Sequence, residues 1–332
     1  MNYLLLICPL IGFILTLLVM PLWIEKSRRI GSLWEDMNKP KHPKNVAASG
    51  GVVVVMAFIL AVLAYIALRT FFGEPFGRIT VQLFALLSMI SILAMVGLVD
   101  DMLGWKNGGL STRARIALAF IASIPLMVIN AGNSSINLPL FGVIEMGILY
   151  PLLLIPVGVA GATTTYNFLA GFNGLEAGQG ILILSFLSFV AYKTGTPWLS
   201  VVGIIMIASL MAFYVFNKSP AKVFPGDSLT WAIGALIAGM AILGNFEKIA
   251  VFVFIPYILE TLLKVRGGLK KQSFAKPNPD GSLEMPYSKI YGLTHLSLFL
   301  LKKMKRKVYE KDVVYLIFIF QVLFILIGLL LI

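Results

Sequence analysis

Ten apolar runs dominate this chain, and most of them are long enough to cross the hydrocarbon core of a membrane as an α-helix. About 20 apolar residues span a bilayer as an α-helix, which satisfies its own backbone hydrogen bonds. Only 13% of the 332 residues are charged, whereas soluble domains carry about 25%. We therefore expect an all-α, polytopic membrane protein rather than a soluble one. The fourth, sixth and eighth runs are short; the ten comprise residues 3–23, 51–68, 80–99, 116–129, 148–168, 180–192, 198–216, 229–243, 249–265 and 313–332.

The basic residues predict the orientation of these runs. If the N-terminus lies outside, the loops after the odd-numbered runs hold 23 of the 27 Lys and Arg residues. Positive residues favour the cytoplasmic side, so we expect both termini outside and the first run retained as a span. Twelve of the 15 acidic residues lie on that side or at its edge; the others are Glu74, Glu145 and Glu247. The single cysteine, Cys8, cannot form an internal disulfide.

We expect one integral-membrane domain over residues 1–332, and its longest cytoplasmic loop spans residues 266–311. Glycines and an Asn-Pro-Asp-Gly turn at residues 278–281 predict turns or a short hairpin in the first half. Apolar residues 293–301 followed by a basic cluster indicate a helix lying at the membrane interface. The alternative is an ordinary basic anchor for the last span.

An acidic pair, Asp100 and Asp101, ends the third run. Adjacent carboxylates repel each other at a membrane edge unless a cation lies nearby. Mg²⁺ is usually held by one or two carboxylates together with substrate phosphates. The pair therefore indicates either a magnesium-dependent site or a solvated helix end.

A second polar segment, residues 167–178, follows the fifth run and carries Asn167, Asn173, Glu176 and several glycines. Glycine lets the backbone approach a ligand closely, and amides can coordinate a cation or bind a nucleobase. The alternative is an Asn/Gly turn that ends a helix. A third segment places Phe224 and Asp227 just before the eighth run, where Asp227 is either a helix N-cap or a metal ligand beside the positive helix end.

Cationic side chains on the same predicted face are suited to phosphate binding, because Arg and Lys neutralise phosphate oxygens. The alternative is that they only set the topology. His295 lies beside an apolar stretch and is more typical of a structural histidine. A transporter would place polar groups near the bilayer midplane, whereas here the mid-membrane segments are nearly uncharged, with Glu260 the main exception. The cations comprise Arg113, Arg115, Arg266, Lys270, Lys271 and Lys276.

Five segments of the chain resemble the polyprenyl-phosphate N-acetylhexosamine-1-phosphate transferase family, and most closely its eukaryotic, dolichol-using branch. The run Leu169–Gln179, which reads LAGFNGLEAGQ, is the most specific of them. The resemblance covers nearly the whole chain and implies ten spans. It suggests an archaeal cell membrane, with endoplasmic reticulum as the alternative. The other segments are Asn38-Lys39 with Gly50-Gly51, residues 97–101, residues 224–227 and residues 283–289.

The resemblance implies a role for each candidate residue. Asp227 would bind Mg²⁺ (or Mn²⁺) with Asn167 as a second ligand, and Asp100 would act on the lipid phosphate with support from Asp101. Asn173 and Phe224 match positions that hold uracil, and Glu176 belongs to the same nucleotide-side loop. The expected contacts to phosphate and sugar come from Arg115, Lys271, Lys276, Arg266 and His295.

The resemblance also implies the reaction, transfer of a HexNAc-1-phosphate from a UDP-sugar to polyprenyl or dolichyl phosphate. Relatives carry an Arg-His-Arg cluster where this chain has Lys270-Lys271-Gln272, so the identity of the sugar stays open. The expected partners are these two substrates and membrane lipids, with no nucleic acid, and a homodimer is left open. The alternative functions are a transferase of another UDP-sugar for cell-envelope polymers, a lipid-linked sugar transporter and an inactive binding protein of the same fold.

Overall fold

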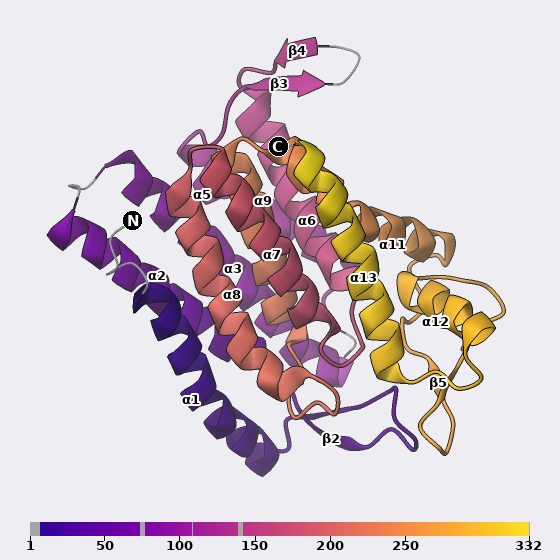
Figure 1. Ribbon diagram of the computed structural model, residues 1–332. Helices are drawn as coiled ribbons and strands as arrows, with labels where there is room; N and C mark the ends of the chain where they lie inside the picture. Colours follow the sequence, from indigo (N-terminus) through magenta and orange to yellow (C-terminus); the bar gives the residue numbers. More distant parts are fainter. Residues whose placement is uncertain (1–6, 74–76, 108, 139–141, 332) are drawn as a thin grey trace.

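The computed structural model describes residues 7–73, 77–107, 109–138 and 142–331, and most of them are helical (Figure 1). Among these residues, seven helices are long and apolar enough to cross a membrane. The chain is therefore a multi-pass membrane protein. The seven are α1 (Ile7–Ile30), α2 (Gly51–Phe72), α3 (Arg78–Asn107), α7 (Leu175–Lys193), α8 (Pro197–Asn217), α9 (Gly226–Gly244) and α13 (Glu310–Gly328).

The other three apolar runs form two-part helices, so the prediction of about ten transmembrane helices is not confirmed. Two are interrupted, at Ser123 and at Phe254, and the third is a π-helical turn that continues directly into an α-helix. A proline lies in the first turn of each second segment: Pro125, Pro156 and Pro256. Proline lacks the N–H that a helix interior needs but is tolerated in a first turn. The three pairs are α4 (Thr112–Ala122) with α5 (Ile124–Val128), the π-helix η2 (Tyr150–Leu154) with α6 (Ile155–Phe168), and α10 (Glu247–Val253) with α11 (Ile255–Arg266).

Two expected helix boundaries were wrong, because the apolar criterion excluded polar first turns that are helical. Helix α7 begins at Leu175 rather than at residue 180, so Glu176 lies in its first turn. Helix α9 begins at Gly226, with Pro225 at the N-cap, so Asp227 is a helical residue and not the cap. Residues 3–6 of the first run and Glu74 lie outside the described residues.

Short hairpins make the fold nearly all-α rather than purely so. The hairpin expected in the long loop is confirmed as β5 (Lys276–Pro277) paired with β6 (Leu283–Glu284), and the helix predicted after it is confirmed as α12 (Leu293–Met304). A 3₁₀ turn, η3 (Leu329–Leu331), follows α13. The other antiparallel pairs are β1 (Leu33–Glu35) with β2 (Lys44–Ala47), and β3 (Ser135–Leu138) with β4 (Gly142–Glu145).

Helix α9 is the central element and is almost wholly buried. Helices α3 and α6 pack along it, while α7 packs on α8, and α1 packs on α2 and α8 (Figure 1). A Cβ atom on Gly234 of α9 would lie 2.6 Å from the Cα atom of Thr163 on α6, so this close approach requires glycine. Outer faces are apolar, as at Leu18 and Leu22 of α1, which suits contact with lipid.

Candidate active site

Three carboxyl groups meet where the last turns of α3 approach the first turn of α9. Asp101 Oδ1 accepts the Asp227 N–H at 2.8 Å, and the carboxyl groups of Asp100 and Asp227 lie within hydrogen-bonding reach of each other. Asp100 and Asp101 are 3% and 4% exposed. We call Asp100, Asp101 and Asp227 the acidic centre. The structure therefore brings together three carboxylates that the sequence analysis marked separately.

Two glycines allow the carboxyl groups to come this close. A Cβ atom on Gly97 would lie 2.5 Å from the carbonyl of Asp227, so any larger residue would separate α3 from α9. Gly226 has φ +70°, and a Cβ there would lie 2.2 Å from Asp101 Oδ2. Gly97 opens the segment 97–101 that the sequence analysis identified, but its role could not be assigned, because a single glycine in a helix has no distinctive pattern.

Arg115 is the cation that the structure pairs with the acidic centre. Its guanidinium lies 2.7 Å from Asp100 Oδ2, and the Leu110 N–H donates to Asp100 Oδ1 at 2.5 Å. Asp101 Oδ2 is buried without a hydrogen-bond partner among the described residues. Three crowded carboxyl groups beside one guanidinium favour binding of a further cation.

Asn167 is joined to the acidic centre through Thr230, which the sequence analysis missed. The Thr230 hydroxyl donates to Asn167 Oδ1 at 3.1 Å and lies 3.3 Å from the Asp227 carbonyl oxygen. Within the described ranges, no group of three His, Cys, Asp or Glu side chains has the spacing of a metal site. Mg²⁺ needs only one or two protein carboxylates besides phosphate and water oxygens, so Asp227, Asn167 and the unpartnered Asp101 oxygen fit it.

A cavity of about 120 Å³ lies beside these residues. Arg115 and Thr112 of α4 form one wall, Thr164 and Asn167 of α6 another, and Trp231 of α9 a third. Leu269, just after α11, closes the remaining side. The cavity therefore brings together residues of α4, α6 and α9 and the segment after α11 next to the acidic centre.

Asn173, one of the predicted nucleotide residues, lies in a second polar cluster. The Asn173 side-chain amide donates to Asp36 at 2.9 Å, and its backbone N–H donates to Glu310 at 2.9 Å. Glu310 also pairs with Lys39. Asp36 and Glu310 were missed, since they lie in unremarkable sequence far from Asn173. These bonds order the loop between α6 and α7.

The other two nucleotide-side residues are placed by the same loop and by the start of α9. Glu176 is buried and accepts the Gly171 N–H at 2.9 Å. Phe224 is half-buried, and its backbone pairs with Ala47 and Gly50. Segments 47–51 and 222–225 therefore run side by side, which joins two of the motifs that the sequence marked.

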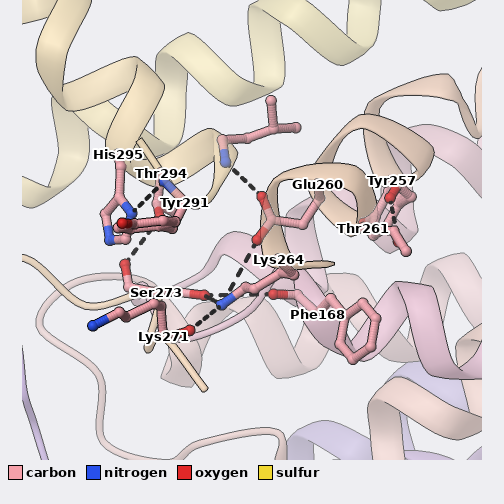
Figure 2. A network of polar contacts seen from close by, with 12 residues as sticks. Phe168, Tyr257, Glu260, Thr261, Lys264, Lys271, Ser273, Tyr291, Thr294 and His295 are labelled. Atoms are coloured by element: carbon pink, nitrogen blue, oxygen red, sulfur yellow. Dashed lines mark hydrogen bonds and ion pairs between the residues drawn. The ribbon is translucent and has the colours of Figure 1, made fainter. Parts of the chain in front are cut away.

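The long loop is tied to α11 by a network of buried groups (Figure 2). Lys264 donates to the Lys271 carbonyl at 3.1 Å and to the Ser273 hydroxyl at 2.6 Å, while Glu260 accepts the N–H of Leu293 at the start of α12. Glu260 and Lys264 are 3.8 Å apart and are 0% and 8% exposed. We call Glu260, Lys264 and Ser273 the loop anchor. The Ser273 hydroxyl also lies 3.5 Å from the Phe168 carbonyl, next to Asn167.

The remaining predicted phosphate ligands lie around this anchor. Arg266, Lys271 and Lys276 are exposed, and the Lys271 ammonium lies 4.9 Å from the centre of the Tyr287 ring. His295 is instead 1% exposed and packs edge-on against Tyr287.

The environment of His295 favours the structural alternative left open by the sequence. Its Nδ1 accepts the Tyr291 N–H at 3.4 Å. Burial lowers the pKa of His295 from 6.5 to about 4, so the ring is neutral at neutral pH. Its Nε2 atom has no hydrogen-bond partner among the described residues, and the role of His295 in substrate binding stays a prediction.

Comparison with known proteins identifies the relatives of this chain. A family model described as glycosyl transferase family 4 matches residues 83–245, which include the acidic centre and Asn167. The chain is 34% identical to a protein of Saccharolobus solfataricus described as a UDP-N-acetylglucosamine–dolichyl-phosphate N-acetylglucosaminephosphotransferase, over 82% of this chain and 80% of that protein. A protein of the same description from Sulfolobus acidocaldarius is 31% identical over 88% of this chain and 86% of its own length. A phospho-N-acetylmuramoyl-pentapeptide-transferase of Streptococcus agalactiae is 29% identical over 76% of each chain.

Proposed function

The chain belongs to glycosyl transferase family 4, and from this premise we propose that it transfers N-acetylglucosamine-1-phosphate from UDP-GlcNAc to dolichyl phosphate. The reaction releases UMP and is the first step of lipid-linked oligosaccharide assembly for N-glycosylation. The observation that carries the proposal is the acidic centre, which stands beside a cavity at the ends of membrane helices. A water-soluble nucleotide sugar and a membrane-bound phosphate can meet at such a place.

In this proposal, a non-bridging oxygen of the lipid phosphate attacks the β-phosphorus of UDP-GlcNAc. The new P–O bond joins the two substrates, and the bond from the β-phosphorus to the bridging oxygen breaks, so that UMP departs. Asp100 takes the proton of a monoprotonated lipid phosphate, with Asp101 supporting its position. Arg115 neutralises charge on the oxygens of the transferred phosphoryl group, where positioning and electrostatics supply most of the catalysis.

Asp227 and Asn167 would hold Mg²⁺, or Mn²⁺, with the free oxygen of Asp101 nearby. When bound, the ion supplies Lewis-acid stabilisation of the pyrophosphate leaving group. Phe224 would stack on the uracil, with Asn173 and Glu176 holding the adjacent loop in shape. Lys271, Lys276 and Arg266 would meet the sugar and phosphates from the long loop.

We place the protein in the cell membrane, with both termini outside and the acidic centre facing the cytoplasm. The uneven distribution of Lys and Arg supports this orientation. The same topology supplies the site with cytoplasmic UDP-GlcNAc.

The decisive experiment is a transfer assay with purified protein, Mg²⁺, dolichyl phosphate and a panel of UDP-sugars. We expect release of UMP with UDP-GlcNAc and a lipid product whose mass equals dolichyl diphosphate plus one GlcNAc. UMP release only with another UDP-sugar would favour the alternative of a transferase for cell-envelope polymers. The similarity to the pentapeptide transferase is the reason to test this alternative. Movement of a lipid-linked sugar across vesicles without UMP release would favour a transporter.

A further inference from the structure

The cavity beside the acidic centre contains polar groups that the fold itself does not use. Trp231 is 1% exposed, and its indole Nε1–H has no hydrogen-bond partner among the described residues. The same holds for the Thr164 hydroxyl and the Nε–H of Arg115. All three residues line the cavity. A buried Trp N–H normally finds an acceptor, so these donors are available to something that enters.

Thr164 differs from its two neighbours in α6. Thr163 and Thr165 each donate their hydroxyl to the backbone carbonyl four residues earlier, at 2.7 Å. Side chains of threonine in helices commonly make this bond. Thr164 alone of the three lines the cavity and lacks such a bond, although its oxygen is buried. Its hydroxyl is therefore free for a ligand.

The chemistry of the cavity wall identifies the kind of ligand. Its three unpartnered groups can all donate hydrogen bonds, and none of the described side chains that line it is acidic. A ligand that is rich in acceptors and negatively charged fits such a wall, and a phosphate group has both properties. The cavity holds about 120 Å³, which exceeds what a single water needs by several-fold.

The cavity also has an apolar mouth. Ile116 and Leu269 both line it, and they are 42% and 50% exposed. The loop that carries Leu269 is held by the contact between Ser273 and the Phe168 carbonyl (Figure 2). The donors thus lie behind apolar side chains, an arrangement open to a phosphate that arrives on a lipid as well as one that arrives on a nucleotide.

We propose that Trp231 Nε1 and Thr164 Oγ1 act with Arg115 as hydrogen-bond donors to a substrate phosphate in this cavity. The inference rests on the proposed transfer reaction and adds two substrate-binding residues to it. Either substrate can supply the phosphate, and the experiment distinguishes them.

The test compares Trp231→Phe and Thr164→Val, which remove the donors but keep the bulk of each side chain. Thr165→Val is the matched control, because its hydroxyl is bonded within the helix. UMP release is measured while one substrate is varied at saturating concentrations of the other. We expect kcat/KM to fall about tenfold or more in each donor variant for the substrate that supplies the phosphate, and not in the control, since hydrogen bonds to charged groups are strong.

Unchanged kcat/KM for both substrates would overturn the inference, and so would equal losses in Thr165→Val. Binding of UDP-GlcNAc and of dolichyl phosphate, measured by thermal stabilisation in EDTA, gives a second readout that does not depend on turnover. If the wild-type protein releases no UMP, the proposed function fails. The inference then still stands or falls on whether the donor variants bind the phosphate ligand more weakly than Thr165→Val does.

Discussion

The acidic centre and the loop anchor are both clusters of buried charge, but they are balanced differently. In the acidic centre three carboxyl groups share one guanidinium, and Asp101 Oδ2 has no hydrogen-bond partner among the described residues. In the loop anchor one carboxyl faces one ammonium, and each also bonds to the backbone that it holds. Glu260 Oε1 has no hydrogen-bond partner among the described residues either, but it lies 3.8 Å from the Lys264 ammonium. The two clusters lie close together, joined through Phe168 and Asn167.

This difference indicates two uses of buried charge. A pair of balanced charge with further hydrogen bonds to the backbone holds elements together. A cluster of unbalanced charge destabilises the unliganded protein, and binding of a ligand of opposite charge stabilises it. We therefore expect substitutions in the loop anchor to reduce stability, and substitutions in the acidic centre to reduce activity.

The largest effect should come from Lys264→Met, which leaves Glu260 buried without its cation. Breaking one side of a buried pair costs about 3–5 kcal/mol. We expect a lower free energy of unfolding, measured by thermal or denaturant unfolding in detergent. The double variant Glu260→Gln/Lys264→Met should recover much of the loss, because no charge is then left uncompensated. A single variant as stable as wild type would remove the basis of the comparison.

Asp227→Asn should reduce transfer activity without reducing stability. We expect transfer activity to fall about 100- to 1,000-fold, because the metal and the leaving group lose a charged ligand. The unfolding temperature in EDTA should stay the same or rise, since one of three crowded carboxylates is removed. Activity is measured as UMP release over a range of Mg²⁺ concentrations. Near-wild-type transfer by this variant would rule out Asp227 as a metal ligand.

A pair of glycine substitutions sharpens the comparison. A Cβ on Gly97 meets the Asp227 backbone, and a Cβ on Gly292 meets Glu260 Oε1 at 2.9 Å. Gly97→Ala should lower kcat about tenfold, because small displacements of reacting groups are costly. Gly292→Ala should lower the unfolding temperature with a smaller change in kcat per folded molecule. The reverse assignment of effects would contradict the division between the two clusters.

The smallest effect concerns pH and the ring beside the loop anchor. The pKa of His295 is lowered from 6.5 to about 4 by burial, so the unfolded chain binds this proton more readily than the folded one. His295 thus contributes stability above about pH 6.5 that is lost as the pH falls toward 4. Unfolding midpoints of wild type and His295→Asn should converge over that window, with His42→Asn as the control. A constant difference between wild type and His295→Asn would contradict the buried, neutral ring.

Much of the fold could be predicted from the sequence, because the lipid bilayer requires each spanning helix to have a certain length and an apolar surface. All ten runs are helical within the described residues, yet two are interrupted shortly before a proline and a third begins as a π-helix, and the hydropathy pattern registers neither feature. The hydropathy pattern also placed the starts of two helices too late. Helix α7 begins at Leu175 and α9 at Gly226, because their first turns contain polar residues that are helical.

The candidate site divides in the same way. Asp100, Asp101, Asn167 and Asp227 were identified from their residue types at the ends of apolar runs. Thr164 and Trp231 could not be identified, because threonine and tryptophan are ordinary residues of a membrane helix. Only their missing hydrogen bonds distinguish them, and a missing bond is a property of the surroundings.

The sequence by itself determined that this chain lies in a membrane, where along the chain its polar residues gather, and which carboxylates are candidates for the site. These properties follow from composition and order along the chain, which set the free energy of placing each segment in lipid or water. Tertiary structure decided which carboxylates are crowded and which are paired. That outcome depends on distances of a few ångströms between α3, α9 and α11, and electrostatic and hydrogen-bond energies change steeply over such distances.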